Sequence, residues 1–98
     1  MERKKLSNEE VETMIGSTSG WRVDEDGLVK RFQFANFAES LAFVNKVGEI
    51  AEAADHHPDI TFGWGYAKLR TTTHDRAGIT DVDFALVEKI DRIGDEKA

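Results

Sequence analysis

The chain has 98 residues, of which 33% are charged and 40% hydrophobic, and its formal net charge is −6. This size predicts one globular domain over residues 1–98, and the negative charge argues against nucleic acid as a direct partner, because phosphate binding needs clustered lysine and arginine. The absence of cysteine excludes disulfides, zinc-thiolate sites and thiol nucleophiles. The N-terminus is polar and no apolar stretch approaches membrane-spanning length, so we expect a cytoplasmic protein that does not bind membranes.

The N-terminal part of the chain predicts a short helix and then a hairpin. Ser7 opens a Ser-Asn-Glu-Glu sequence with the spacing of a capping box, and the helix that follows is expected to end near Ile15. Strands are predicted over 20–24 and 28–34. The Glu25–Gly27 segment between them contains Asp-Gly, which is a strong signal for a hairpin turn.

A longer helix is predicted to begin after Asn36, which has Glu39 at the capping-box position. It must stop near 55–57, because Pro58 disfavours helical geometry in the residue before it. The apolar residues of this helix form two stripes that together predict a face wide enough to cover a sheet. The first stripe is Phe37, Leu41, Val44, Gly48 and Ala51, and the second is Phe43, Val47, Ile50 and Ala54.

The C-terminal part predicts a second hairpin over 59–74 and a final helix that starts over 80–83 and ends at Gly94. The inner residues of that helix are expected to be Val82, Leu86, Ile90 and Ile93. The order αββαββα, with two hairpins and a covering helix, predicts an α+β fold. In this fold a four-stranded antiparallel sheet carries helices packed on one face.

The chain has three histidines, His56, His57 and His74, and the second hairpin predicts that they come together. Residues directly opposite each other in a hairpin share a face, and matching apolar residues leaves two registers. If Gly65-Tyr66 forms a two-residue turn, with glycine in the favoured first central position, His57 lies opposite His74. The other register places His57 opposite Thr72. In both registers all the imidazoles are expected to converge at one end of the hairpin.

Two chemistries fit such a cluster. Three neutral imidazoles can hold zinc, although adjacent histidines rarely both reach one ion and neither HxH nor HExxH is present. Imidazoles also exchange protons near neutral pH, which suits chemistry on a polar heterocycle. Glu52 precedes His56 by one helical turn, so its carboxylate is expected to orient an imidazole. As surface or capping residues, histidines near a helix end would explain one of the three but not their convergence.

Other polar and aromatic residues lie on the same hairpin. Lys68 and Arg70 share the polar strand face with His74, where they are either solvated or bind an anion or a partner. Trp21 and Trp64 are predicted to be core or interface residues rather than plates on which a ligand stacks. Trp64, which lies between two glycines, is the more ambiguous of the two tryptophans.

The stretches AEAADHHPDI and TTTHDRAGITDVDF resemble pterin-4a-carbinolamine dehydratases, also called 4a-hydroxytetrahydrobiopterin dehydratases. The shared pattern is a glutamate, three residues, His-His-Pro, and later Thr-His followed by Ala-Gly-Ile-Thr and an aspartate. The Gly-Trp at 20–21 and the spaced phenylalanines of 32–47 also match. The resemblance extends from about Leu6 to Ile93.

The resemblance implies the same αββαββα fold, a homodimer or homotetramer, and a cytoplasmic lyase without a metal or other cofactor. The implied substrate is the 4a-hydroxytetrahydropterin left after an aromatic amino acid hydroxylase turns over. Its dehydration gives quinonoid dihydropterin, as in tetrahydrobiopterin recycling. The implied catalytic residues are His56 and His74 as the acid–base pair and Glu52 as the orienting carboxylate. The implied substrate-binding residues are His57, Asp83, Trp21 and Asp55.

Two features modify this expectation. Asp83 is expected either to orient His74 or to cap the final helix. Asp59 and Ile60 stand where the family usually has a glutamate and an aromatic residue, and the hairpin tip at 63–66 is unusual, so the shape of the pocket differs. Some relatives act as transcriptional coactivators or assembly factors. The alternative function is therefore a non-enzymatic protein-binding module on the same fold.

Overall fold

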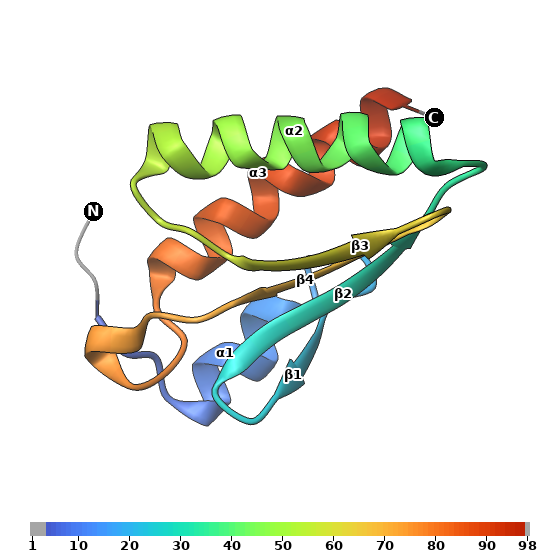
Figure 1. Ribbon diagram of the computed structural model, residues 1–98. Coiled ribbons are helices and arrows are strands. Elements are labelled where there is room, and N and C mark those ends of the chain that lie inside the picture. The colour runs from blue at the N-terminus through green and yellow to red at the C-terminus, as the bar shows by residue number, and fades with distance from the viewer. Residues whose placement is uncertain (1–3, 98) are drawn as a thin grey trace.

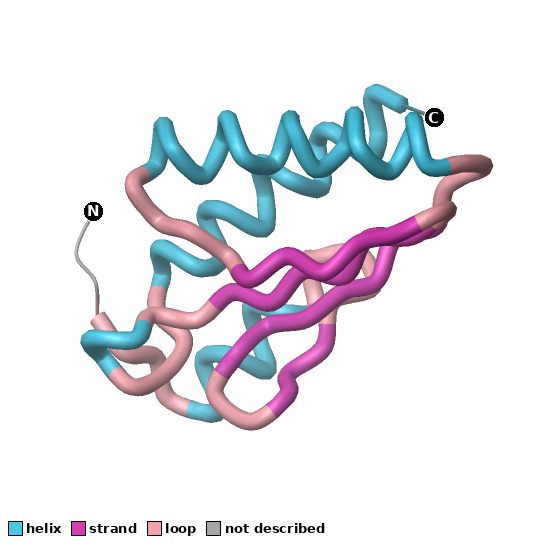
Figure 2. Tube along the Cα trace, in the orientation of Figure 1, coloured by secondary structure: helices cyan, strands magenta, loops and turns pink. Residues whose placement is uncertain are grey.

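The computed structural model describes residues 4–97 and confirms the predicted α+β fold. The elements, in chain order, are α1 (Asn8–Ile15), β1 (Arg22–Asp24), β2 (Gly27–Gln33), α2 (Phe37–Ala54), β3 (Asp59–Gly63), β4 (Tyr66–Thr71), the 3-10 turn η1 (His74–Arg76) and α3 (Asp81–Lys97). The four strands form one antiparallel sheet in the order β1-β2-β4-β3. Helices α2 and α3 lie across the sheet (Figures 1 and 2), and none of the described helices is long and apolar enough to cross a bilayer.

Local sequence signals set the beginnings of the first two helices. The side chain of Ser7 accepts from the N–H of Glu10, and the Glu10 carboxylate accepts from the N–H of Ser7, which completes the capping box of α1. Asn36 caps α2 through its side chain, which accepts from the N–H of Glu39. The Glu39 carboxylate accepts from the N–H of Ala35, one residue before the cap. Both predicted starts are therefore confirmed.

One core fills the space between the sheet and the helices. It receives Val11 from α1, Phe43 and Val47 from α2, and Leu86 from α3, all at most 6% exposed. Strand residues that point toward the helices complete it, namely Leu28, Phe32, Ile60, Phe62, Ala67 and Leu69. All three helices contribute to this one cluster, so they share one face of the sheet and leave the other, outer face without a helix.

The second hairpin adopts the second of the two registers considered from the sequence. Phe62 pairs with Ala67 and Ile60 with Leu69, so Trp64-Gly65 is the two-residue turn and not Gly65-Tyr66. Glycine is needed at position 65 because φ is +81° there. The register that would place His57 directly opposite His74 is therefore not adopted. The register with Gly65 as the first central residue of the turn rested on the preference for glycine at that position. In the structure Gly65 is the second central residue, and that residue has the positive φ.

The first hairpin turn also differs from the prediction. Asp24 pairs with Gly27, so Glu25 and Asp26 are the central residues and Glu25 carries the positive φ, 57°. Gly27 belongs to β2 instead. A Cβ at position 27 would lie 2.7 Å from the Cζ of Arg70, because the Arg70 guanidinium lies over the backbone of Gly27. Glycine, which has no Cβ, fits there without displacing Arg70.

Two helix predictions need correction. The first apolar stripe of α2 does not lie wholly on the sheet, because Phe37 and Leu41 are 44% and 40% exposed. The second stripe supplies most of the contact with the core, through Phe43 and Val47. The final helix does not end at Gly94 but continues to Lys97. A single glycine inside a helix costs only about 1 kcal/mol, which neighbouring good helix formers offset.

Candidate functional site

The end of α2 sends the two adjacent histidines in different directions. Asp55 adopts the left-handed conformation, with φ 52° and ψ 42°, which aspartate tolerates better than most residues. The N–H of Asp55 donates to the Glu52 carbonyl at 3.2 Å, and the N–H of His56 donates to the Ala51 carbonyl at 3.1 Å. This pair of bonds is a Schellman motif. Beyond it the His56 side chain is 7% exposed, whereas that of His57 is 56% exposed.

A fully buried carboxylate, that of Asp83, holds His56. The Nε2 atom of His56 lies 2.6 Å from Oδ1 of Asp83, and the hydroxyl of Thr71 donates to the same oxygen at 2.6 Å. The other oxygen, Oδ2, accepts from the Thr73 hydroxyl at 2.8 Å and from the N–H of Thr80 at 2.9 Å. Four donors thus satisfy both oxygens, as burial of a charged carboxylate requires.

The direction of each proton in this network follows from the number of donors. Thr73 has one hydroxyl proton and gives it to Asp83, so in the 2.8 Å contact between Thr73 and Thr80 the Thr80 hydroxyl is the donor. The Thr80 oxygen in turn accepts from the N–H of Val82 at 3.2 Å. Because the carboxylate accepts, His56 donates from Nε2. Its Nδ1 then carries no proton in the neutral ring and is left for another partner.

His57 has a carboxylate partner of its own. Its Nε2 contacts Oε2 of Glu52, and both side chains are largely exposed. The structure therefore corrects two expectations about the pairing. Glu52 holds His57 rather than His56. Asp83 holds His56 rather than His74. Its carboxylate also accepts from the N–H of Thr80, the residue before α3, and so helps to cap the start of that helix.

His74 begins η1, in a loop that closes where Thr73 and Gly78 form a two-way backbone bridge. The side chain of His74 is exposed. The pKa of the Asp26 carboxyl is lowered chiefly by its hydrogen bond from Arg70, and the charge of His74 contributes to the same shift. The hydroxyl of Thr72, two residues before His74, donates to the carbonyl of Asp26 at 2.6 Å, so the start of this loop lies beside the β1–β2 turn. This loop and the segment between α2 and β3 occur at the same end of the sheet (Figure 1).

The remaining predicted substrate-binding residues lie elsewhere. Trp21 is 6% exposed, its ring packs edge-on against Phe32, and its indole N–H donates to Asp91 at 2.8 Å. Trp21 is therefore a core residue, as its sequence context predicted, and not an exposed substrate contact as the family resemblance implied. Asp55 is exposed beside His56. Among the residues that the structure describes, no three His, Asp or Glu side chains form a group that could hold a metal ion.

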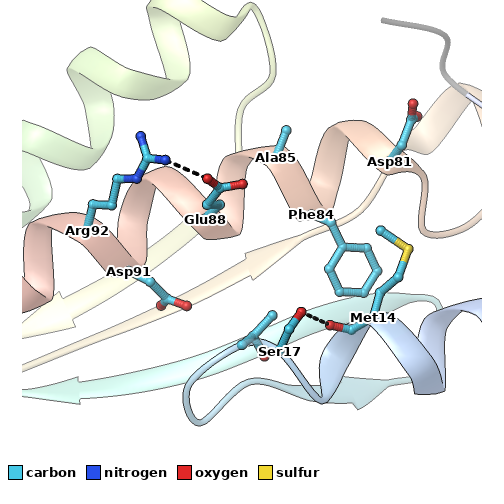
Figure 3. A pocket seen from close by; sticks show the side chains of 9 residues that line it. Met14, Ser17, Asp81, Phe84, Ala85, Glu88, Asp91 and Arg92 are labelled. Carbon is cyan, nitrogen blue, oxygen red and sulfur yellow. Dashed lines mark hydrogen bonds and ion pairs between the residues drawn. The ribbon is translucent and has the colours of Figure 1, made fainter.

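His56 borders a pocket of about 310 Å³ between the end of α2 and the first turns of α3. Its other lining residues are Ala54, Asp55, Val82, Ala85, Leu86 and Lys89. A second pocket, of about 560 Å³, lies between α1 and α3, with Met14 and Phe84 facing each other across it (Figure 3). No histidine lines that second pocket. Of these two pockets, the one beside His56 adjoins the candidate site.

The structure adds Thr71 and Thr73 to the site. From the sequence, neither threonine is assigned a role in the site. Their hydroxyls instead donate to Asp83 and so fix the carboxylate that holds His56. The signal present in the sequence was alternation: Thr71 and Thr73 lie two residues apart and share one face, directed toward the helices.

Comparison with known proteins gives one family. The family model for pterin 4 alpha carbinolamine dehydratase matches residues 4–93. A protein of Rubrobacter xylanophilus named "Putative pterin-4-alpha-carbinolamine dehydratase" is 48% identical over 89 residues, which cover 90% of this chain and 83% of that one. A protein of the same name from Halorhodospira halophila is 43% identical over 91% of this chain and 84% of its own.

Two solved structures share the fold. The crystal structure of a transcriptional coactivator/pterin dehydratase from Brucella melitensis superposes with a TM-score of 0.87 at 25% identity, covering 92% of this chain and 98% of that one. A pterin dehydratase-like protein identified as a RuBisCO assembly factor in the alpha-carboxysome superposes with a TM-score of 0.64, also at 25% identity. It covers 76% of this chain and 88% of its own.

Proposed function

Because this chain belongs to the pterin-4a-carbinolamine dehydratase family, we propose that it is a cytoplasmic lyase that dehydrates 4a-hydroxytetrahydropterin to quinonoid dihydropterin. The observation that carries this proposal is the pairing of His56 with the buried Asp83 at 2.6 Å. A carboxylate behind an imidazole fixes its tautomer and its orientation, which general acid–base catalysis requires.

The reaction needs two proton movements. The bond between C4a and the hydroxyl oxygen breaks, the oxygen takes a proton and leaves as water, and the adjacent ring nitrogen loses its proton as a double bond forms between it and C4a. His56 and His74 are the acid–base pair in this proposal. His56 is held by Asp83 with Nδ1 as the nitrogen left for proton exchange, and His74 is exposed on a loop anchored through Thr73 to the same carboxylate. Each proton transfer contributes about 10²–10⁴-fold.

His57 holds the substrate in this proposal, and the Glu52 carboxylate orients the His57 ring. Asp55, exposed beside His56, is a second substrate contact. Asp83 is fully buried and so acts as a positioning residue, through His56. Trp21 is buried and its indole N–H is bonded to Asp91, so it has no role in this mechanism.

Stopped-flow dehydration of a synthetic 4a-hydroxytetrahydropterin tests the proposal. The wild type should exceed the buffer rate, and His56→Ala and His74→Ala should each lower kcat about 10²-fold or more. Lys46→Gln, which alters an exposed residue of α2, is the control and should match the wild type. A wild-type rate equal to that of buffer would remove the enzymatic proposal. Two fully active histidine variants would instead remove the site.

We further propose that the chain forms a homodimer or homotetramer. The support is an exposed apolar surface on α2, where Phe37 and Leu41 are 44% and 40% exposed and the Phe37 ring stacks on Phe62 at 5.6 Å. Light scattering tests this proposal, because Leu41→Glu should lower the assembled mass while the far-ultraviolet circular dichroism stays unchanged. An unaltered mass would contradict it.

A protein-binding module on the same fold is the second candidate. Trp64 at the tip of the β3–β4 hairpin is 72% exposed, and one structural neighbour is a pterin dehydratase-like protein identified as a RuBisCO assembly factor. In this case Trp64→Ala should abolish a protein interaction while His56→Ala leaves it intact. The dehydratase proposal makes the reverse prediction for turnover, so the same two variants separate the two functions.

A further inference from the structure

The outer face of the sheet carries a set of cations that the proposed dehydration does not use. Strand pairing puts Arg31 directly beside Lys68, and Arg22 lies on the same face, next to Val29 of β2. We define Arg22, Arg31 and Lys68 as the outer basic surface. All three are exposed, and none of the helices formed by residues 4–97 covers this face of the sheet.

Within the part of the chain that the structure describes, the cations of the outer basic surface lack a carboxylate partner. Among the side chains that the structure describes, none of the three takes part in an ion pair. Arg31 and Lys68 are direct cross-strand neighbours, with Cβ atoms about 4.5–5.5 Å apart, and like charges in that position repel. Asp24 and Asp59 also lie on this face, but neither is paired directly with Arg31 or Lys68: Asp59 is opposite Arg70, and Asp24 is opposite Gly27. Among the described strand residues, no directly paired carboxylate therefore relieves the repulsion between Arg31 and Lys68.

The surface is also ordered in advance. The guanidinium of Arg31 lies over the ring of Tyr66, 4.4 Å from its centroid, which restricts its rotamers. Val29 points to the outer face and is nevertheless 0% exposed, so its neighbours cover it. One of these, Arg70, is fixed over Gly27 and by its bond to Asp26. Side chains that are already placed lose less entropy when a ligand binds.

We propose that the outer basic surface docks a short acidic segment of a partner protein. A carboxylate between Arg31 and Lys68 would remove their repulsion and form charge-assisted hydrogen bonds with both. The chain carries a net charge of −6, which opposes long polyanions such as nucleic acid and extended anionic membranes. A short segment responds mainly to charges within about 8–10 Å, the screening length at physiological salt, and the direct cross-strand neighbours of Lys68 are Arg31 and Thr61 rather than acidic residues.

The proposal is tested with the intact chain and a synthetic peptide of alternating glutamate and serine, followed by amide chemical shifts. The expected shifts fall on β2 and β4 around Arg31 and Lys68. Lys68→Gln should weaken binding about tenfold, which corresponds to 1.4 kcal/mol. Lys46→Gln removes the same charge from an exposed position on α2 and should leave the affinity unchanged. Binding should also weaken as ionic strength rises.

A second readout does not require the peptide. Lys68→Glu replaces a like-charge pair with an attractive one, so it should raise the urea midpoint of the free chain while abolishing peptide binding. The proposal is overturned if the peptide shifts no amide on β2 or β4, or if Lys46→Gln weakens binding as much as Lys68→Gln. It is also overturned if single-stranded DNA binds this surface more tightly than the peptide. None of these results depends on dehydratase activity.

Discussion

His56 and His57 are adjacent in the chain, yet their environments have little in common. His56 is 7% exposed and bonded to a carboxylate that is fully buried and receives three further hydrogen bonds. His57 is 56% exposed and its partner Glu52 is 78% exposed. The left-handed conformation of Asp55 ends α2 and turns the chain, so that the two histidine side chains point in different directions.

The comparison teaches that similar histidine–carboxylate pairs have unequal energetic consequences. Water solvates the pair at His57 when it separates, so its contribution to stability is small. Water does not reach Asp83, so every donor that is lost leaves part of a charge unsatisfied. The buried pair also spans elements, because it joins the end of α2, the end of β4 and the start of α3. It can therefore position the site, while the exposed pair remains free to meet a ligand.

The strongest test of this contrast removes the buried carboxylate. Asp83→Ala should lower the free energy of unfolding by about 3–5 kcal/mol, because His56, Thr71 and Thr73 lose their common acceptor. Urea denaturation measures the change. Asp81→Ala, in the same first turn of α3, is the matched control and should have a much smaller effect. Equal losses for the two variants would show that the network has no special importance.

The two histidines allow a direct comparison. His56→Ala removes a buried donor to a charged group and should cost about 2 kcal/mol of unfolding free energy. His57→Ala removes an exposed contact and should cost less than about 0.5 kcal/mol. Both values come from the same denaturation experiment. A larger stability loss for His57→Ala than for His56→Ala would show that burial does not set the energetic contribution of the two pairs.

The threonines sharpen the comparison within the buried network. Thr71→Val and Thr73→Val keep the side-chain volume but remove a donor to Asp83, and each should cost about 1–2 kcal/mol. Thr13→Val is the control, since the Thr13 hydroxyl donates to the Glu9 carbonyl on the exposed side of α1. Stability losses limited to Thr13→Val would contradict the argument.

The smallest effect concerns an exposed carboxylate, that of Asp26. The hydrogen bond from Arg70 lowers its pKa, so Arg70→Gln should move that pKa upward toward the ordinary value of an aspartate. Because the folded-state pKa is lowered, the stabilisation is present above the unfolded pKa and is lost as pH falls through the folded pKa. Arg70→Gln should weaken this acid dependence. Carbon-13 titration of the carboxyl measures the pKa, and an unchanged value would exclude Arg70 as the cause.

Much of the fold was predictable because its signals act over a few residues. The caps at Ser7 and Asn36 and the stop before Pro58 each lie within one turn of the helix end that they control. The register of the second hairpin was narrowed to two choices by alternation. The choice between them is visible only in the structure, where the turn of the adopted register also contacts β2 through the bond from the N–H of Phe34 to the carbonyl of Gly65.

The sequence by itself determined the order of the elements and the end of the sheet to which the histidines belong. Only the tertiary structure decided which carboxylate holds which histidine. Glu52 is near both histidines along the chain, whereas Asp83 is 27 residues from His56 and reaches it because α3 packs beside the end of α2. The physical reason is that helix and strand periodicity constrain neighbours in sequence. The partner of a buried charge is instead set by which elements share the core.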